Sequence, residues 1–106
     1  MLQEVIYTNS NQPNEPQSII FSSIDEYVAW RENNPEYAIQ EILDLDSKVY
    51  FDPELASLVD YSGEVLQFPV NVIAKSLLSG ETITFNHIDE ETAMNLMVDE
   101  WDLYLN

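Results

Sequence analysis

Runs of strand-forming residues separated by polar segments predict several short β-strands along this chain. The predicted strands cover residues 2–8, 18–21, 37–45, 64–68 and 81–85. We expect the polar, proline-containing segment 9–16 to be a loop between the first two strands. The apolar spacing in 37–45 also fits a helix. The strand is favoured there because the segment follows a helix stop and leads to the β-like residues 48–51.

The clearest helix start lies between the second and third predicted strands. Ser23-Ile24-Asp25-Glu26 matches a capping box, in which a serine side chain and a glutamate side chain bond backbone N–H groups of the first turn. We expect this helix to end at Asn33-Asn34-Pro35, because proline disfavours helical backbone in the residue before it. Its predicted apolar face carries Ile24, Tyr27 and Val28.

Two further segments carry weaker helix signals. Asp52-Pro53-Glu54 predicts a short helix, with the aspartate as N-cap and the proline at the first helical position. Pro69 is expected to open another helix, because apolar residues follow it at i, i+3, i+4 and i+7 spacing. Gly80 is expected to end that helix.

The longest predicted helix runs from Asp89 to Leu105, where apolar residues recur on one broad arc. The opposite arc carries Glu91, Asn95, Asp99 and Asp102. At about 1.5 Å per residue, Glu91 and Asp102 would lie about 16 Å apart along one helix face. The pattern predicts an exposed acidic stripe that has no paired cation.

Together these elements predict an α+β fold over residues 1–106. We expect one compact domain with a small, mainly antiparallel sheet, three or four helices and a long C-terminal helix. The 106 residues, 45% of them hydrophobic, are enough to bury a core without cross-links. The chain has no cysteine, which excludes disulfides, thiolate metal sites and cysteine nucleophiles.

Charge separates this chain from an ordinary small domain. Twenty Asp and Glu residues stand against Arg31, Lys48 and Lys75, so the formal net charge is −17. Repulsion opposes direct binding to nucleic acid or to an anionic membrane, and any partner should be basic. The acids are spread along the chain and form no terminal tail. Adaptation to high salt is an alternative explanation, and the content of Ile, Leu and Tyr argues against it.

The sequence offers little equipment for catalysis or for binding a cofactor. His87 is the only histidine, and we expect it to be an ordinary exposed or helix-start residue. Asp44 and Asp46 lack the twelve-residue loop of a calcium site, and two glycines cannot build a phosphate-binding loop. We therefore expect no enzymatic activity, no cofactor and no dedicated metal site.

The first nine residues lack both the basic and the apolar region of a secretion signal, and no apolar run approaches the length needed to span a bilayer. The absence of cysteine suits a reducing compartment. We expect a cytoplasmic protein, with an infected bacterial host as one setting.

In its small size, extreme acidity and lack of catalytic groups, the chain resembles the DNA-mimic proteins of bacteriophages and mobile elements. Such proteins act against restriction enzymes, CRISPR nucleases or DNA repair glycosylases. The resemblance is one of composition and rests on no motif. It implies an inhibitor whose carboxylates imitate the phosphate backbone and block the basic groove of a DNA- or RNA-handling protein.

Mimicry of this kind requires the acids to crowd on one face. Area scaling gives about one net charge per 350 Å² if the charge is spread evenly, against about one per 100 Å² on duplex DNA. The alternative is a non-mimetic binding module, such as a toxin immunity protein, a phage protein that modulates transcription, or an assembly factor. Apolar side chains would then supply most of the affinity.

A solvated helix face would also explain the acidic stripe, but such faces normally mix in lysines. Met94, Met97 and Trp101 are expected in the core; if exposed, they would suit a dimer interface or an apolar anchor beside acids. The protein is expected to be a monomer or a homodimer. The predicted partner-binding residues are surface acids that would meet Lys or Arg: Glu91, Asp99, Asp102, Asp89, Glu90, Glu100, Asp25, Glu26 and Glu32.

Overall fold

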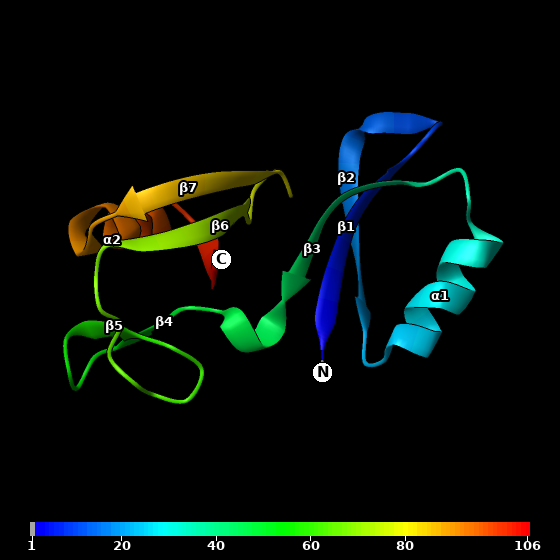
Figure 1. Ribbon diagram of the computed structural model, residues 1–106. Coiled ribbons are helices and arrows are strands. Elements are labelled where there is room, and N and C mark those ends of the chain that lie inside the picture. The colour runs from blue at the N-terminus through cyan, green and yellow to red at the C-terminus, as the bar shows by residue number, and fades with distance from the viewer. Residues whose placement is uncertain (1) are drawn as a thin grey trace.

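A computed structural model describes residues 2–106 and shows a mostly β protein (Figure 1). The strands are β1 (Gln3–Asn9), β2 (Gln12–Phe21), β3 (Ala38–Asp44), β4 (Tyr50–Asp52), β5 (Ser57–Val59), β6 (Val70–Ser76), β7 (Thr82–Ile88) and β8 (Trp101–Leu105). The helices are α1 (Ile24–Asn33), the 3-10 helix η1 (Leu45–Ser47) and α2 (Glu90–Val98).

The strands form three small antiparallel sheets. The N-terminal sheet has the order β2-β1-β3, the C-terminal sheet has the order β7-β6-β8, and β4 and β5 form a separate hairpin. Helices α1 and α2 lie at opposite ends of the molecule, with the sheets between them (Figure 1). The protein measures 45 × 27 × 21 Å, and its radius of gyration of 15.0 Å exceeds the value of about 13 Å typical for this length. The molecule is therefore elongated.

Helix α1 packs on the N-terminal sheet through aromatic rings. The Trp30 ring lies 5.0 Å from the Tyr7 ring and 5.3 Å from the Phe21 ring. The predicted capping signal is confirmed, because the Ser23 hydroxyl accepts the backbone N–H of Glu26. Of the predicted apolar face, Ile24 and Val28 are exposed, so the aromatic side chains of this helix make the packing contacts.

The two sheets pack against each other at β1, β6 and β8. Each of these strands has packed side chains on both of its sides. On one face of the C-terminal sheet, Ile73 and Tyr104 pack with Ile6 and Leu43 of the N-terminal sheet. On the other face lies a larger core, next to α2 and the β4–β5 hairpin. Its buried residues are Val49, Leu58, Val72, Ala74, Ile88, Ala93 and Leu103.

The predicted helix from Asp89 to Leu105 is wrong beyond Val98. Asp99 is the C-cap of α2, Glu100 has a φ of 67°, and the chain then continues as β8. In β8, Leu103 and Tyr104 are neighbours in sequence and are buried in the two different cores. A strand points successive side chains to opposite faces, whereas a helix would separate these two by only about 100°.

The other two predicted helices are also wrong. Residues after Pro69 form β6, in which Val72, Ala74 and Ser76 are buried, so the period of burial is two. At Asp52 the side chain accepts the backbone N–H groups of Glu54 and Leu55, as an N-cap would. These bonds instead close the turn between β4 and β5, because the same aspartate chemistry serves turns and helix starts.

The predicted loop 9–16 is mostly strand, because β2 begins at Gln12 and continues through Pro13 and Pro16. β2 is an edge strand, where proline is tolerated because N–H groups that face away from β1 form no ladder bond. The predicted strand 64–68 is reduced to a bridge between Val65 and Val59. The strands predicted over 2–8, 37–45 and 81–85 are confirmed, but the α+β class with three or four helices and a long C-terminal helix is wrong.

The junction between α2 and β8 can be tested at Glu100. Its positive φ is unfavourable for any side chain with a Cβ, so Glu100→Gly should be more stable than Glu100→Gln, by up to about 1 kcal/mol. The two variants carry the same charge, and urea unfolding of both isolates the backbone effect. A continuous helix would give the opposite order, because glycine inside a helix costs about 1 kcal/mol.

Candidate functional site

All three basic side chains make contacts within the fold. The Arg31 guanidinium donates to the backbone carbonyls of Asn34 and Tyr37 and so holds the end of α1. The ammonium of Lys75 lies 2.6 Å from the Glu4 carboxylate, and that of Lys48 lies 3.6 Å from the Asp102 carboxylate. Each of the three basic side chains therefore contributes to contacts that hold the fold together.

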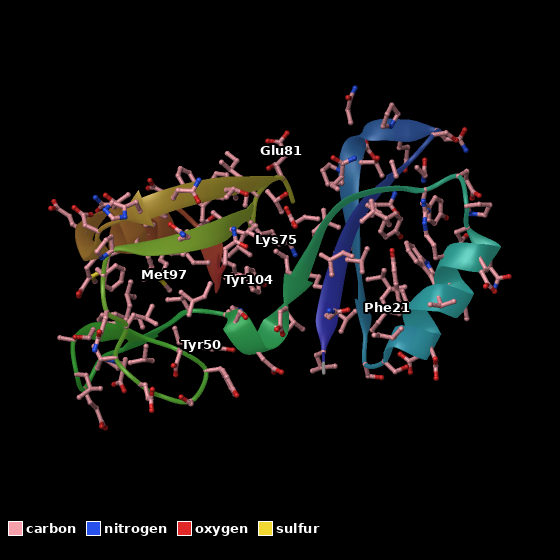
Figure 2. The ribbon with its side chains drawn as sticks, viewed as in Figure 1. Phe21, Tyr50, Lys75, Glu81, Met97 and Tyr104 are labelled. Atoms are coloured by element: carbon pink, nitrogen blue, oxygen red, sulfur yellow. The ribbon has the colours of Figure 1, made fainter. Side chains whose placement is uncertain are left out.

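Both lysine pairs line a groove of about 590 Å³ between the sheets, which we call the inter-sheet groove. Figure 2 shows Lys75, Tyr104 and Tyr50 in this part of the molecule. Lys48 also lies 5.6 Å from the centre of the Tyr50 ring. Burial raises the pKa of the Tyr104 hydroxyl above its ordinary value, and the charges of Glu4 and Asp102 raise it further. Both effects favour the protonated phenol.

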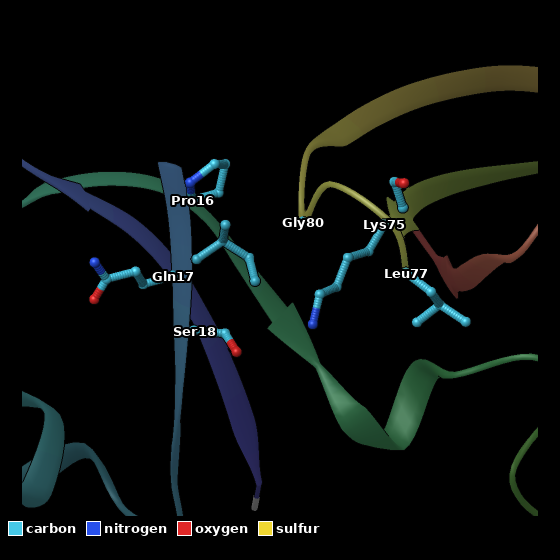
Figure 3. Close-up of a pocket in the computed structure, with 8 residues that line it drawn as sticks. Pro16, Gln17, Ser18, Lys75, Leu77 and Gly80 are labelled. Carbon is cyan, nitrogen blue, oxygen red and sulfur yellow. The ribbon is translucent and has the colours of Figure 1, made fainter. Parts of the chain in front are cut away.

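A smaller cavity of about 180 Å³ opens on another side of Lys75 (Figure 3). Residues Pro16, Gln17 and Ser18 of β2 line it, together with the turn that follows β6. Gly80 in this turn has a φ of 79°, and a Cβ there would lie 3.5 Å from Pro16. Lys75 lines both cavities, and its ammonium is paired with Glu4. We therefore interpret both cavities as gaps in the packing between the sheets and not as binding or catalytic sites.

Three of the nine predicted partner-binding acids have structural roles. Asp102 lies on β8 and pairs with Lys48. Asp89 is the N-cap of α2, and hydrogen bonds from the Thr92 side chain and backbone lower its pKa below the ordinary value. Glu26 accepts the backbone N–H of Ser22 before α1. Replacing these acids would therefore disturb the fold as well as the surface charge.

The other six predicted acids are divided between the two helices and the turn after α2. Asp25 and Glu32 lie on α1, which is separated from α2 by both sheets (Figure 1). Glu90 and Glu91 lie in the first turn of α2, while Asp99 and Glu100 follow its last turn. The predicted acidic stripe along one helix face does not form, because that helix ends at Val98.

Most carboxylates are nevertheless free of ion pairs. In residues 2–106, only Glu4 and Asp102 pair with a lysine, so 18 of the 20 acids have no cationic partner. An accessible area of 6561 Å² shared among 17 net charges gives about one per 390 Å², against about one per 100 Å² on duplex DNA. Along the 45 Å axis the same charge amounts to about one per 2.6 Å, against about one per 1.7 Å in the duplex.

Sequence reasoning missed a second surface feature, an apolar groove of about 340 Å³. We call it the methionine groove; it is lined by Phe51, Leu58, Met94, Met97 and Val98. Met94, Met97 and Trp101 pack against the core as expected, and the two methionines also face this groove. The helical spacing of the methionines was visible in the sequence. The hairpin that forms the opposite wall was not.

The described residues show no arrangement typical of a catalytic or metal centre. His87 is exposed on β7, and its backbone N–H donates to the Asn71 side chain. Among residues 2–106, no three His, Asp or Glu side chains are grouped so that they could hold a metal ion. Within the same residues, no helix has the length and apolar character needed to cross a bilayer.

Comparison with known protein families, with curated proteins and with solved structures finds no match to this chain.

The unpaired carboxylates predict that salt stabilises this protein. Raising the salt concentration from about 0.01 M to about 0.1 M shortens the screening length from about 30 Å to about 10 Å and weakens their mutual repulsion. We expect Tm to rise, since each 1 kcal/mol of relief corresponds to about 4–8 °C for a domain of this size. A variant carrying Asp25→Asn, Glu32→Gln, Glu91→Gln and Asp99→Asn should melt higher at low salt and gain less from added salt. A flat or falling Tm for the wild type would contradict this explanation.

The ion pair between Lys75 and Glu4 should hold the two sheets together. Lys75→Met leaves the Glu4 carboxylate buried without its cation, and the free energy of unfolding should fall by about 3 kcal/mol. Adding Glu4→Gln to that variant should restore most of the loss, because the uncompensated charge is removed. Urea unfolding at neutral pH measures both changes. A loss below about 1 kcal/mol would show that this ion pair stabilises the fold no more than an ordinary exposed ion pair does.

Proposed function

We propose that this chain is a non-enzymatic inhibitor that binds a basic, nucleic-acid-handling protein in place of DNA or RNA. The observation that carries the proposal is the commitment of all three cations to contacts within the fold. The remaining 18 carboxylates carry no ion pair in residues 2–106. A basic partner would relieve the repulsion that these charges cause.

The shape of the molecule supports mimicry of the long-range field of a duplex. Its 45 Å length matches about 13 base pairs at about 3.4 Å each, and its charge per unit length is about two thirds of the duplex value. Its cross-section of 27 × 21 Å is somewhat wider than a duplex with a diameter of about 20 Å. Such a body would be drawn into a long basic groove and would occupy it.

The proposal differs from imitation of phosphate spacing on a single face. The predicted acids are spread over α1, α2, the turn after α2 and β8, and the charge per unit area is about a quarter of the duplex value. Affinity would therefore come from the field of the whole surface, supplemented by local contacts. Asp25, Glu32, Glu91 and Asp99 stay our predicted contacts, because their side chains take part in none of the hydrogen bonds and ion pairs described above.

A partner found by affinity capture would test the proposal. The protein is immobilised, incubated with nuclease-treated bacterial lysate and eluted with a salt gradient, and bound proteins are identified by mass spectrometry. We expect a basic DNA- or RNA-binding protein that elutes at moderate salt. Duplex DNA or RNA added at constant salt should release the same protein, because both ligands compete for one groove.

The variant with Asp25→Asn, Glu32→Gln, Glu91→Gln and Asp99→Asn is the control for charge. It should bind the captured protein more weakly and with a smaller salt dependence, while its circular dichroism stays unchanged. Retention of the partner in the presence of saturating nucleic acid would contradict mimicry.

The methionine groove favours a second candidate function, the non-mimetic binding module. In that case apolar contacts would dominate, and the captured protein would resist both salt and competing nucleic acid. An immunity protein or an assembly factor would behave in this way.

A further inference from the structure

The methionine groove has a closed floor and open sides. Leu58 at its base is fully buried, whereas Phe51 and Val98 are 45% and 78% exposed. Met94 and Met97 are half-buried between them, and Figure 2 places Met97 in the region between the C-terminal sheet and the β4–β5 hairpin. Methionine side chains are flexible and polarisable, and they adapt to inserted apolar groups. The volume of about 340 Å³ lies at the lower end of the usual range for binding pockets.

Every charged side chain on the elements that form this groove is acidic. Glu90 and Glu91 lie one helical turn before Met94, on the same side of α2. Asp99 directly follows Val98 at the end of α2. Residues 49–74 and 76–106 contain no lysine or arginine at all. The groove is therefore lined by apolar side chains, and the charged residues on the elements around it are acids.

This charge pattern selects among the possible occupants. A second copy of the chain also carries a net charge of −17, so repulsion opposes a dimer across this face. Anionic lipids and nucleic acids are opposed for the same reason. A segment with apolar side chains on one face and Lys or Arg beside them complements both the groove and its edge.

We propose that the methionine groove binds a basic amphipathic segment of a partner protein. An apolar side chain of that segment enters between Met94, Met97 and Phe51, and its flanking cations meet the acids at the ends of α2. The inference deepens the proposed function, on which it rests for the basic character of the partner. Without the groove, the partner would be held by the charge of the whole surface alone. The groove adds an apolar contact at one defined place.

Methyl NMR tests the groove directly, because the chain has only three methionines, Met1, Met94 and Met97. The protein is labelled at the methionine methyl groups and titrated with a synthetic amphipathic helix that carries Leu and Trp at i, i+4 and i+7 and Lys elsewhere. We expect the signals of Met94 and Met97 to shift. Unmoved Met94 and Met97 signals would overturn the inference.

Two matched substitutions locate the contact. Val98→Gln should weaken peptide binding by about tenfold, because Val98 lies at the edge of the groove. Leu78→Gln should leave binding unchanged, since Leu78 is equally exposed, at 80%, and lies in the turn after β6. Unchanged urea midpoints would show that neither substitution disturbs the fold. Equal effects of the two substitutions would overturn the assignment.

Two control peptides separate the contributions of charge and apolar contact. A peptide with Gln in place of Leu and Trp keeps the cations, and one with Glu in place of Lys keeps the apolar face. Both should bind at least about tenfold more weakly than the parent peptide. If the Gln peptide bound as tightly as the parent peptide, the groove would not take part in the interaction. That result would overturn the inference without contradicting the proposed function. Strong peptide binding, with a captured partner that nucleic acid does not release, would support the groove and contradict mimicry.

Discussion

The contact between the two sheets is the constraint on which the rest of this structure depends. At this contact the Lys75 ammonium meets the Glu4 carboxylate, and Tyr104 and Ile73 pack on Ile6 and Leu43. The strands β1, β6 and β8 are consequently covered on both faces, so the hydrophobic residues divide into two cores instead of one. This arrangement places the sheets side by side along the 45 Å axis, with a helix at each end.

The same contact accounts for the distribution of charge. A lysine at the centre of the interface balances a buried glutamate, a second lysine balances Asp102 nearby, and Arg31 closes the end of α1. Among residues 2–106 no basic side chain remains to offset the other carboxylates, and their repulsion opposes the compact state. The stability lost in this way is the physical reason to connect the surface charge with a basic partner.

Electrostatic attraction and apolar contact would contribute differently to such an interaction. The field of the whole surface acts over distances up to the screening length and raises the rate of encounter, without specifying which residues touch. The methionine groove would act only at contact, where Met94 and Met97 desolvate an apolar group. An acidic protein that combines the two could discriminate among basic partners, which surface charge alone does poorly.

The amino-acid sequence by itself determined the net charge, the lack of cysteine chemistry, the capped helix α1 and the strands β1 and β7, because each depends on local residues. It favoured a strand for β3, where the apolar spacing also fitted a helix. It also identified Met94 and Met97 as either core residues or an anchor. Only the tertiary structure decided that β6 and β8 are strands, since their apolar spacing fits both periods. Burial of Leu103 and Tyr104 in two different cores selects the period of two. The predicted acidic stripe was wrong for the same reason. α2 ends at Val98, so Asp102 lies on β8 and does not share a helix face with Glu91.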